Sequence, residues 1–77
     1  MVKMTEKQIM DILEDELVSK LEMDAEGQWD SLDYVTIIQR LDTEFDGKVE
    51  EVPEQELATM TTPRKIINLL REKKIIE

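Results

Sequence analysis

The 77-residue sequence contains neither cysteine nor histidine. Without cysteine, no disulfide can brace the chain and no thiolate can bind a metal ion. Without histidine, the chain lacks the commonest general base, the commonest metal ligand and any Ser-His triad. A chain of this length forms one small domain with one thin core rather than an enclosed active site. We therefore expect a single domain over residues 1–77 that is not an enzyme and binds no metal.

Long hydrophobic runs are missing as well. Residues 1–20 are charged and amphipathic and contain no apolar run of the kind found in a signal peptide. No other segment approaches the length of a membrane span. We expect a cytoplasmic, monomeric protein that does not insert into membranes.

Basic residues are scarce relative to acidic ones: 19 acids against 10 bases give a net charge of −9. This balance disfavours nucleic acids and anionic membranes as partners and favours basic docking surfaces. The excess is uneven, because residues 59–77 hold five bases and two acids whereas residues 1–58 hold five bases and 17 acids. An acidic surface also serves solubility alone, so the charge by itself selects no partner.

A capping box indicates where the first helix begins. Thr5 and Gln8 have the required spacing, and Met4 and Ile9 are placed as a hydrophobic staple. Apolar residues then recur at helical spacing and predict a helix over about 5–20. Its apolar stripe is expected to contain Ile9, Met10, Ile12, Leu13, Leu17, Val18 and Leu21.

A polar connection over 22–30 leads to the most apolar helix, which is expected over about 31–45. Asp30 can cap its first N–H groups, and Gly47 suits the position just past its end. This helix carries the largest apolar residues and should be central to the core. Its apolar face is expected to consist of Tyr34, Ile37, Ile38, Leu41 and Phe45, with Val35 at the edge.

The remaining elements are shorter. Residues 48–52 are predicted to form a loop with Val49 or Val52 pointing inward. Pro53 suits the first position of a short helix that continues through Ala58.

A last helix is predicted from Thr62 as N-cap and Pro63 as first residue to about Lys73. Ile75 and Ile76 would either extend it or fray. The expected fold class is all-α: a small antiparallel four-helix bundle of three main helices and one short one.

Ser31 stands between Asp30 and Leu32 at the start of the central helix. The N–H groups of a first helical turn are unpaired and the dipole is positive there, so a phosphate on this hydroxyl would find hydrogen-bond donors. The chain offers no base that would activate Ser31 as a nucleophile. The alternative is that Asp30-Ser31 is only a helix start, where both residue types are favoured.

The motif Asp30-Ser31-Leu32 resembles that of the acyl carrier protein family, the phosphopantetheine-bearing domains. The similarity covers most of the chain and follows the same helix order. The stretch Trp29-Asp30-Ser31-Leu32 is more similar to specialised carriers than to the housekeeping fatty-acid type, and the connection ahead of Ser31 is short for the family. The further residues that carry the resemblance are Asp33, Val35, Leu41, Glu44, Phe45, Met60-Thr61-Thr62 and Ile66-Ile67.

The resemblance implies that Ser31 bears 4′-phosphopantetheine, which a phosphopantetheinyl transferase takes from coenzyme A, and that Asp30 and Leu32 complete the cofactor-binding motif. The thiol of this group would hold a fatty acyl, polyketide or aminoacyl cargo as a thioester. Partner enzymes of fatty-acid, lipid or secondary-metabolite biosynthesis would load and use that cargo. A small acidic helical interaction module without a prosthetic group is the competing function.

The resemblance also implies two sets of surface and core residues. Partner enzymes with basic docking surfaces would contact the helix after Ser31, where Thr36 and Arg40 are expected to be exposed and to interrupt the acidic row. The recognition residues are then Asp33, Thr36, Arg40 and Glu44. An acyl pocket would be lined by Val35, Ile38, Leu57, Met60 and Ile67, although the periodicity of these residues is also that of an ordinary packed core.

Overall fold

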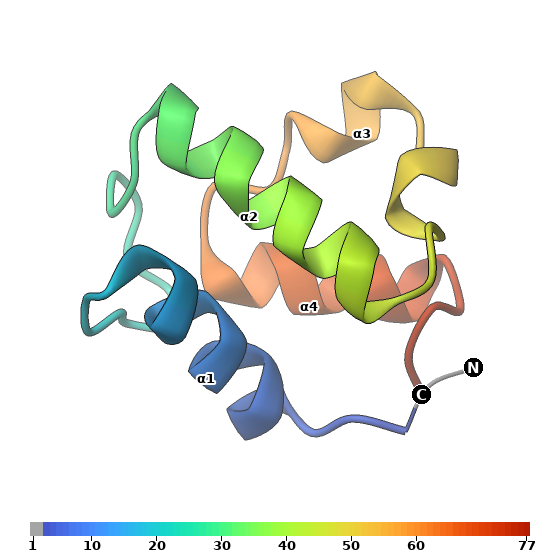
Figure 1. The fold of residues 1–77 in the computed structure, drawn as a ribbon, viewed down its shortest axis with the longest axis horizontal. Coiled ribbons are helices and arrows are strands. Elements are labelled where there is room, and N and C mark those ends of the chain that lie inside the picture. Colours follow the sequence, from blue (N-terminus) through green and yellow to red (C-terminus); the bar gives the residue numbers. More distant parts are fainter. Residues whose placement is uncertain (1–2) are drawn as a thin grey trace.

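The computed structural model describes residues 3–77 and consists of helices joined by short connections (Figure 1). This part of the chain contains no strand, as the sequence predicts. Its Cα radius of gyration is 11.2 Å, close to the roughly 11.5 Å expected for a folded chain of this length. The elements in order are α1 (Glu6–Leu17), α2 (Ser31–Glu44), the 3₁₀ helix η1 (Val49–Glu51), α3 (Glu54–Leu57) and α4 (Pro63–Glu72).

The start of α1 follows the predicted capping box. The Gln8 amide donates to Thr5 Oγ1 at 3.2 Å, and the Thr5 amide donates to Gln8 Oε1 at 2.7 Å. Two of the orphan donors at the helix start are thereby paired. Met4 packs against the core at the staple position.

The predicted end of α1 is wrong by about one turn. The helix stops at Leu17 because Val18 takes a left-handed conformation, with φ 51° and ψ 45°. Val18 is 89 % exposed and does not belong to the apolar stripe. The turn brings Leu21 back to the core, where its amide donates to Glu14 Oε2 at 2.8 Å. Leu21 is therefore buried from a position outside the helix, and the expected last turn of α1 does not form.

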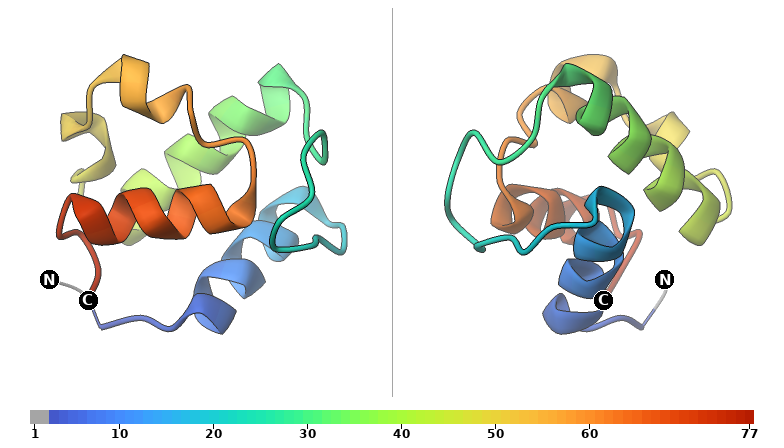
Figure 2. Two further views of the ribbon diagram at one scale, coloured as in Figure 1. Left: turned by 180° about the vertical axis from the view of Figure 1, so that it is seen from behind. Right: turned by 60° about the vertical axis from the view of Figure 1, so that its left-hand side comes forward.

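Three helices enclose the core. Figures 1 and 2 show that α2 and α4 both start on the side of the molecule where residues 18–30 connect α1 to α2. Helix α1 runs toward that side. Helix α1 packs against both α2 and α4. The fully buried core side chains come from α1, α2, η1, α4 and the residues that follow α2, α3 and α4: Ile9, Leu13, Ile37, Leu41, Phe45, Val49, Met60, Ile66, Ile67, Leu70 and Ile76.

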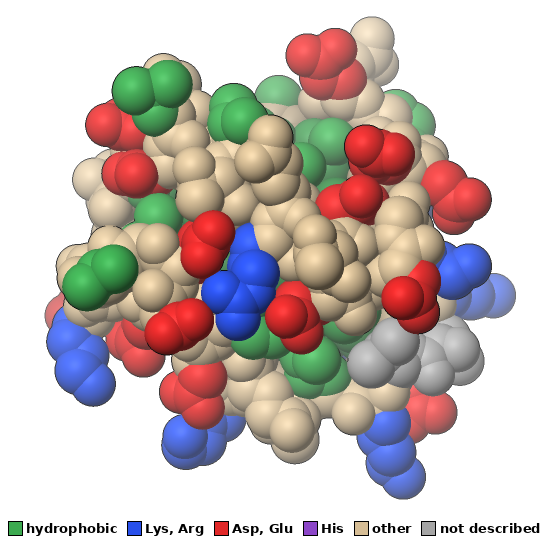
Figure 3. All heavy atoms as spheres, in the orientation of Figure 1, with side chains coloured by type: hydrophobic (Ala, Val, Ile, Leu, Met, Phe, Trp, Pro, Cys, Tyr) green, Lys and Arg blue, Asp and Glu red, His purple; other side chains and the backbone are tan. Residues whose placement is uncertain are grey.

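The surface is largely polar. Acidic side chains are spread over the face drawn in Figure 3, with hydrophobic side chains scattered among them. The large hydrophobic side chains with the greatest exposure are Val18, Leu32 and Val35. No helix in the described range is both long enough and apolar enough to cross a bilayer.

The segment between α2 and α4 departs from prediction in detail. The expected loop over 48–52 contains η1, and both Val49 and Val52 are buried. Pro53 precedes α3 as its N-cap instead of forming its first residue, since its ψ of 140° is extended. The short helix therefore occupies Glu54–Leu57.

The last helix begins as predicted, with Thr62 Oγ1 accepting from the Lys65 amide at 3.2 Å and Pro63 at the first position. The end of the chain differs from prediction, because Ile75 and Ile76 neither extend α4 nor fray. Lys74 has φ 60°, and the chain turns so that both isoleucines are buried.

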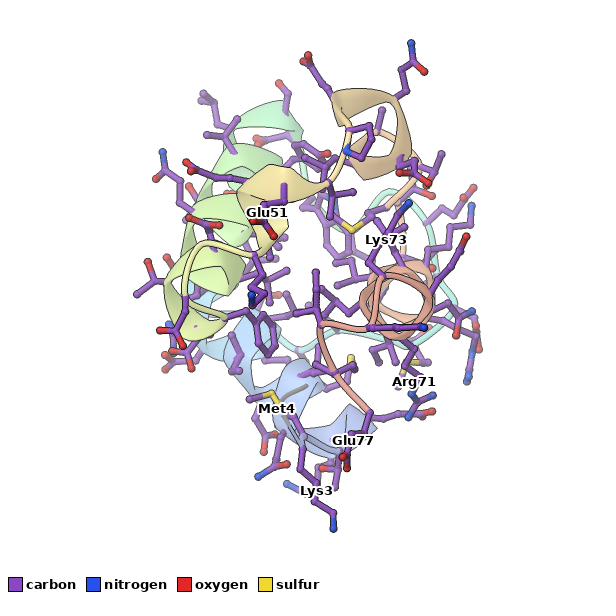
Figure 4. All side chains as sticks on the ribbon, turned by 90° about the vertical axis from the view of Figure 1, so that its right-hand side faces the viewer. Lys3, Met4, Glu51, Arg71, Lys73 and Glu77 are labelled. Carbon is purple, nitrogen blue, oxygen red and sulfur yellow. The ribbon has the colours of Figure 1, made fainter. Side chains whose placement is uncertain are left out.

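Figure 4 shows Arg71 and Glu77 at this end of the molecule. There Arg71 Nε donates to the Glu77 carbonyl at 3.4 Å. Lys73 Nζ lies 2.7 Å from Oε2 of Glu56, a residue of α3. The C-terminal residues are thus fastened to the fold by apolar burial and by polar contacts.

Candidate functional site

Ser31 is the first residue of α2, and its side chain is exposed. Asp30 caps the helix: its Oδ1 accepts from the Asp33 amide at 2.8 Å, and its carbonyl accepts from the Tyr34 amide at 2.9 Å. The amides of Ser31 and Leu32, at the first two helical positions, have no partner within the helix by geometry. The Ser31 hydroxyl is therefore presented outward at the positive end of a 14-residue helix.

An open hollow of about 480 Å³ lies beside Ser31. The apolar part of its wall comes from three segments: the connection before α2, the first turn of α2 and the stretch after α3. The polar rim includes Glu26 and Thr61. The apolar side chains of the wall are Trp29, Tyr34, Ala58 and Met60.

The connection that carries Trp29 and Asp30 is held by its own residues. Gln28 Oε1 accepts from the Glu22 amide at 2.6 Å, and Gln28 Nε2 donates to the carbonyls of Glu22 and Ala25 at 2.8 and 2.7 Å. A backbone hydrogen bond of 3.0 Å from the Arg64 amide to the Met23 carbonyl fastens it to α4. Leu21 belongs to the core, and Met23 packs against it.

Two ion pairs strengthen that attachment. Arg64 Nε lies 2.6 Å from Asp24 Oδ1, and Lys65 Nζ lies 2.9 Å from Glu26 Oε1. Thr61 Oγ1 also donates to Glu26 Oε1 at 2.8 Å, and these contacts, led by the hydrogen bond from Lys65, hold the pKa of Glu26 below its ordinary value. The basic character of residues 59–77 is thus used partly to position the connection before Ser31. The sequence shows this charge asymmetry but does not show which acids these basic residues contact.

Arg40 is not the exposed recognition residue that was expected. Its Nη1 lies 3.2 Å from both Asp15 Oδ2 and Glu16 Oε2 on α1, and its Nε lies 3.2 Å from Glu44 Oε1 on α2. The side chain is 28 % exposed. The hydrogen bonds that Arg40 donates to Asp15 and then to Glu44 raise the pKa of Arg40 above its ordinary value. Arg40 therefore joins α1 to α2 with its charge matched inside the protein.

Replacing Arg40 with glutamate is expected to lower the free energy of unfolding by about 2 kcal/mol, because it adds a fourth carboxylate to the three around this site. The melting temperature should fall by about 8 to 16 °C in a domain of this size, and added salt should reduce the difference. Thermal unfolding followed by circular dichroism checks this. Lys7→Glu is the control, since the Lys7 ion pair is exposed and its loss should cost no more than about 0.5 kcal/mol. Equal destabilisation by the two variants would show that the change in net charge, and not the loss of the Arg40 ion pairs, lowers the free energy of unfolding.

The other expected recognition residues are placed less uniformly than a row along α2. Thr36 is half-buried rather than exposed, and its Oγ1 donates to the Leu32 carbonyl at 3.1 Å. Asp33 lies in the first turn and is partly exposed. Glu44 is paired with Arg40 at the other end of the helix. Asp33 therefore lies at the positive end of α2, whereas Glu44 lies at the other end in an ion pair with Arg40.

The five residues expected around an acyl pocket do not share one cavity. Val35, Ile38 and Leu57 line an open groove of about 570 Å³ between α2 and the 50–57 segment. Met60 lines the hollow beside Ser31, and Ile67 is buried in the core and lines neither depression.

The sequence patterns did not predict two residues of the site. Trp29 and Tyr34 both line the hollow beside Ser31. Helical spacing could have located Tyr34, because side chains three residues apart on a helix are neighbours. Trp29 lies in an irregular segment, where no periodicity indicates the direction of a side chain.

The comparisons with family models, curated proteins and solved structures found no match to this chain.

Proposed function

We propose that this chain is an acyl carrier protein in which Ser31 bears 4′-phosphopantetheine. The observation that supports this best is an exposed serine hydroxyl at the first position of α2, a helix that Asp30 caps. An apolar hollow borders this hydroxyl. The proposal includes the antiparallel bundle of that family, a cytoplasmic location and a role as a substrate of other enzymes. The branch is a specialised one, serving a dedicated pathway.

The residues around Ser31 fit such a group. A phosphodiester on the hydroxyl would lie near the unpaired amides of the first turn of α2 and the positive end of its dipole. The arm beyond it would meet the apolar side chains of Trp29, Tyr34 and Met60. When bound, the group supplies a thiol that holds an acyl cargo as a thioester.

Attachment needs a separate enzyme, the phosphopantetheinyl transferase. The Ser31 Oγ–P bond forms as the phosphoanhydride bond of coenzyme A breaks, adenosine 3′,5′-bisphosphate leaves, and the serine proton passes to a base of the transferase. The chain has no histidine to accept that proton. Its own part is to present the hydroxyl and to hold the surrounding backbone in place through the ties of the 22–30 connection to α4.

Intact mass tests the proposal. The purified chain is incubated with coenzyme A, magnesium and each of several phosphopantetheinyl transferases, and a reaction without coenzyme A is the control. We expect a mass gain of one phosphopantetheine group per chain, mapped to the peptide containing Ser31. A chain that stays unmodified with every transferase would contradict the proposal and leave the acidic interaction module as the function.

Partner enzymes are proposed to dock on the surface around Ser31 through basic residues. Replacing Thr36 with glutamate should then raise the rate of loading by a housekeeping fatty-acid enzyme by up to about fivefold at low salt, because it adds an acid one turn from Asp33. The initial rate of malonyl loading on the holo form, at low and high salt, is the measurement. Thr43→Glu adds the same charge near the end of α2 and is the matched control. An unchanged rate, or equal gains in both variants, would show that local charge near Ser31 does not select the partner.

A further inference from the structure

Tyr34 lines both depressions on this side of the molecule. The first is the hollow beside Ser31, and the second is the groove between α2 and the 50–57 segment. Ser31 lines the hollow but not the groove. Of the residues that form the two walls, Tyr34 is the one that they share, so its ring stands where one depression passes into the other.

The position of Tyr34 on α2 explains this placement. It follows Ser31 by three residues and precedes Ile38 by four, so its side chain lies next to both on the helix surface. The ring packs against the core and is half-buried. Burial and then the negative charge of Glu54, which lines the groove, raise the pKa of its hydroxyl above the ordinary value. The ring thus reaches from the side of Ser31 to the rim of the groove.

We propose that the Tyr34 ring is a specificity-determining partition that confines a chain tethered at Ser31 to the hollow and favours short acyl cargo over long. This inference rests on the proposed function and concerns the cargo class that the chain shelters. A flexible arm attached to Ser31 enters the hollow first, because Ser31 is part of its wall. Along the surface of α2, Tyr34 lies between Ser31 and Ile38, which belongs to the apolar groove beyond together with Val35 and Leu57. Carbons that extend past the hollow therefore remain in water while Tyr34 is in place.

The test is the reactivity of the tethered thioester. Acetyl-, butyryl- and octanoyl-phosphopantetheine are transferred to the chain from the corresponding acyl-coenzyme A, and cleavage by hydroxylamine is followed by intact mass. In the unaltered protein, the octanoyl thioester should be cleaved within about twofold of the rate for free octanoyl-pantetheine, because the acyl carbons that extend past the hollow have no apolar surface to enter. In Tyr34→Ala, the open passage should slow its cleavage about tenfold, the effect of removing roughly two methylene groups from water. The acetyl thioester should not respond to the substitution.

Two further variants keep the result interpretable. Tyr34→Phe keeps the ring and removes only the hydroxyl, so it should behave as the unaltered chain. Tyr34→Leu removes the ring but retains an apolar side chain for packing, and it carries the test if circular dichroism shows that the alanine variant is unfolded.

Three results would overturn the partition: protection of the octanoyl group in the unaltered chain, equal rates with and without the ring, or protection in the phenylalanine variant. Failure of the proposed function looks different, because no acyl-phosphopantetheine would then be attached and the mass would not change.

Discussion

Replacing Ser31 with alanine is expected to abolish phosphopantetheine attachment completely. In the proposed function the hydroxyl oxygen would form the bond to phosphorus, and alanine has no atom that can take its place. Folding should be nearly unaffected, with a change of less than about 0.5 kcal/mol in the free energy of unfolding, because the exposed hydroxyl leaves no cavity. The Asp30 side chain would still accept from the Asp33 amide and cap the helix.

The chain offers a matched control for this experiment. Its other serine, Ser19, is also exposed but follows the end of α1 instead of starting a helix. Ser19→Ala should accept the group at the rate of the unaltered chain, as measured by intact mass over time. Attachment that survives in Ser31→Ala, or is lost in Ser19→Ala, would move the modification site away from the start of α2.

Replacing Ile76 with alanine is expected to lower the free energy of unfolding by about 3 kcal/mol, because it removes buried methyl and methylene groups and leaves a cavity. Ile76 is only 1 % exposed although it is the penultimate residue. For a domain of this size, the melting temperature should fall by about 12 to 24 °C. This is a large part of the stability of a small domain, which is about 5 kcal/mol or somewhat more. Urea unfolding followed by circular dichroism gives the free energy directly.

Val18→Ala serves as the comparison, since Val18 is a branched apolar residue that lies almost fully in water. Its substitution should change the free energy of unfolding by less than about 0.5 kcal/mol. If the two variants unfold at the same urea concentration, the C-terminal isoleucines are not part of the cooperative core.

The starts of the main helices follow from neighbouring residues in the sequence. Thr5 with Gln8, Asp30, and Thr62 with Pro63 each mark a helix start that the structure has in the same place. A cap is a contact between a side chain and an amide two or three residues away, so the local sequence contains all of its parts. The position of Ser31 at the first residue of α2 is predictable for the same reason.

The sequence was less informative about how the site is enclosed. The hollow beside Ser31 draws on Trp29 before the helix and Met60 after α3, which are 31 positions apart in the chain. Residues at helical spacing were expected around one acyl pocket, yet Val35 faces the groove while Ile67 lies in the core. Periodicity identifies the apolar side of each helix, but the distances between helices depend on how all of them pack.

By itself, the sequence determined the helical class of the fold, the helix starts and the exposed serine at the start of α2, because capping and helical periodicity act within a few residues. Only the tertiary structure decided the end of α1 at Val18, the burial of Ile76 and the pairing of Arg40 with acids on α1. Each of these depends on a contact between distant parts of the chain. An apolar side chain leaves water wherever packing offers a place, and a charged one pairs with whichever opposite charge the fold brings near.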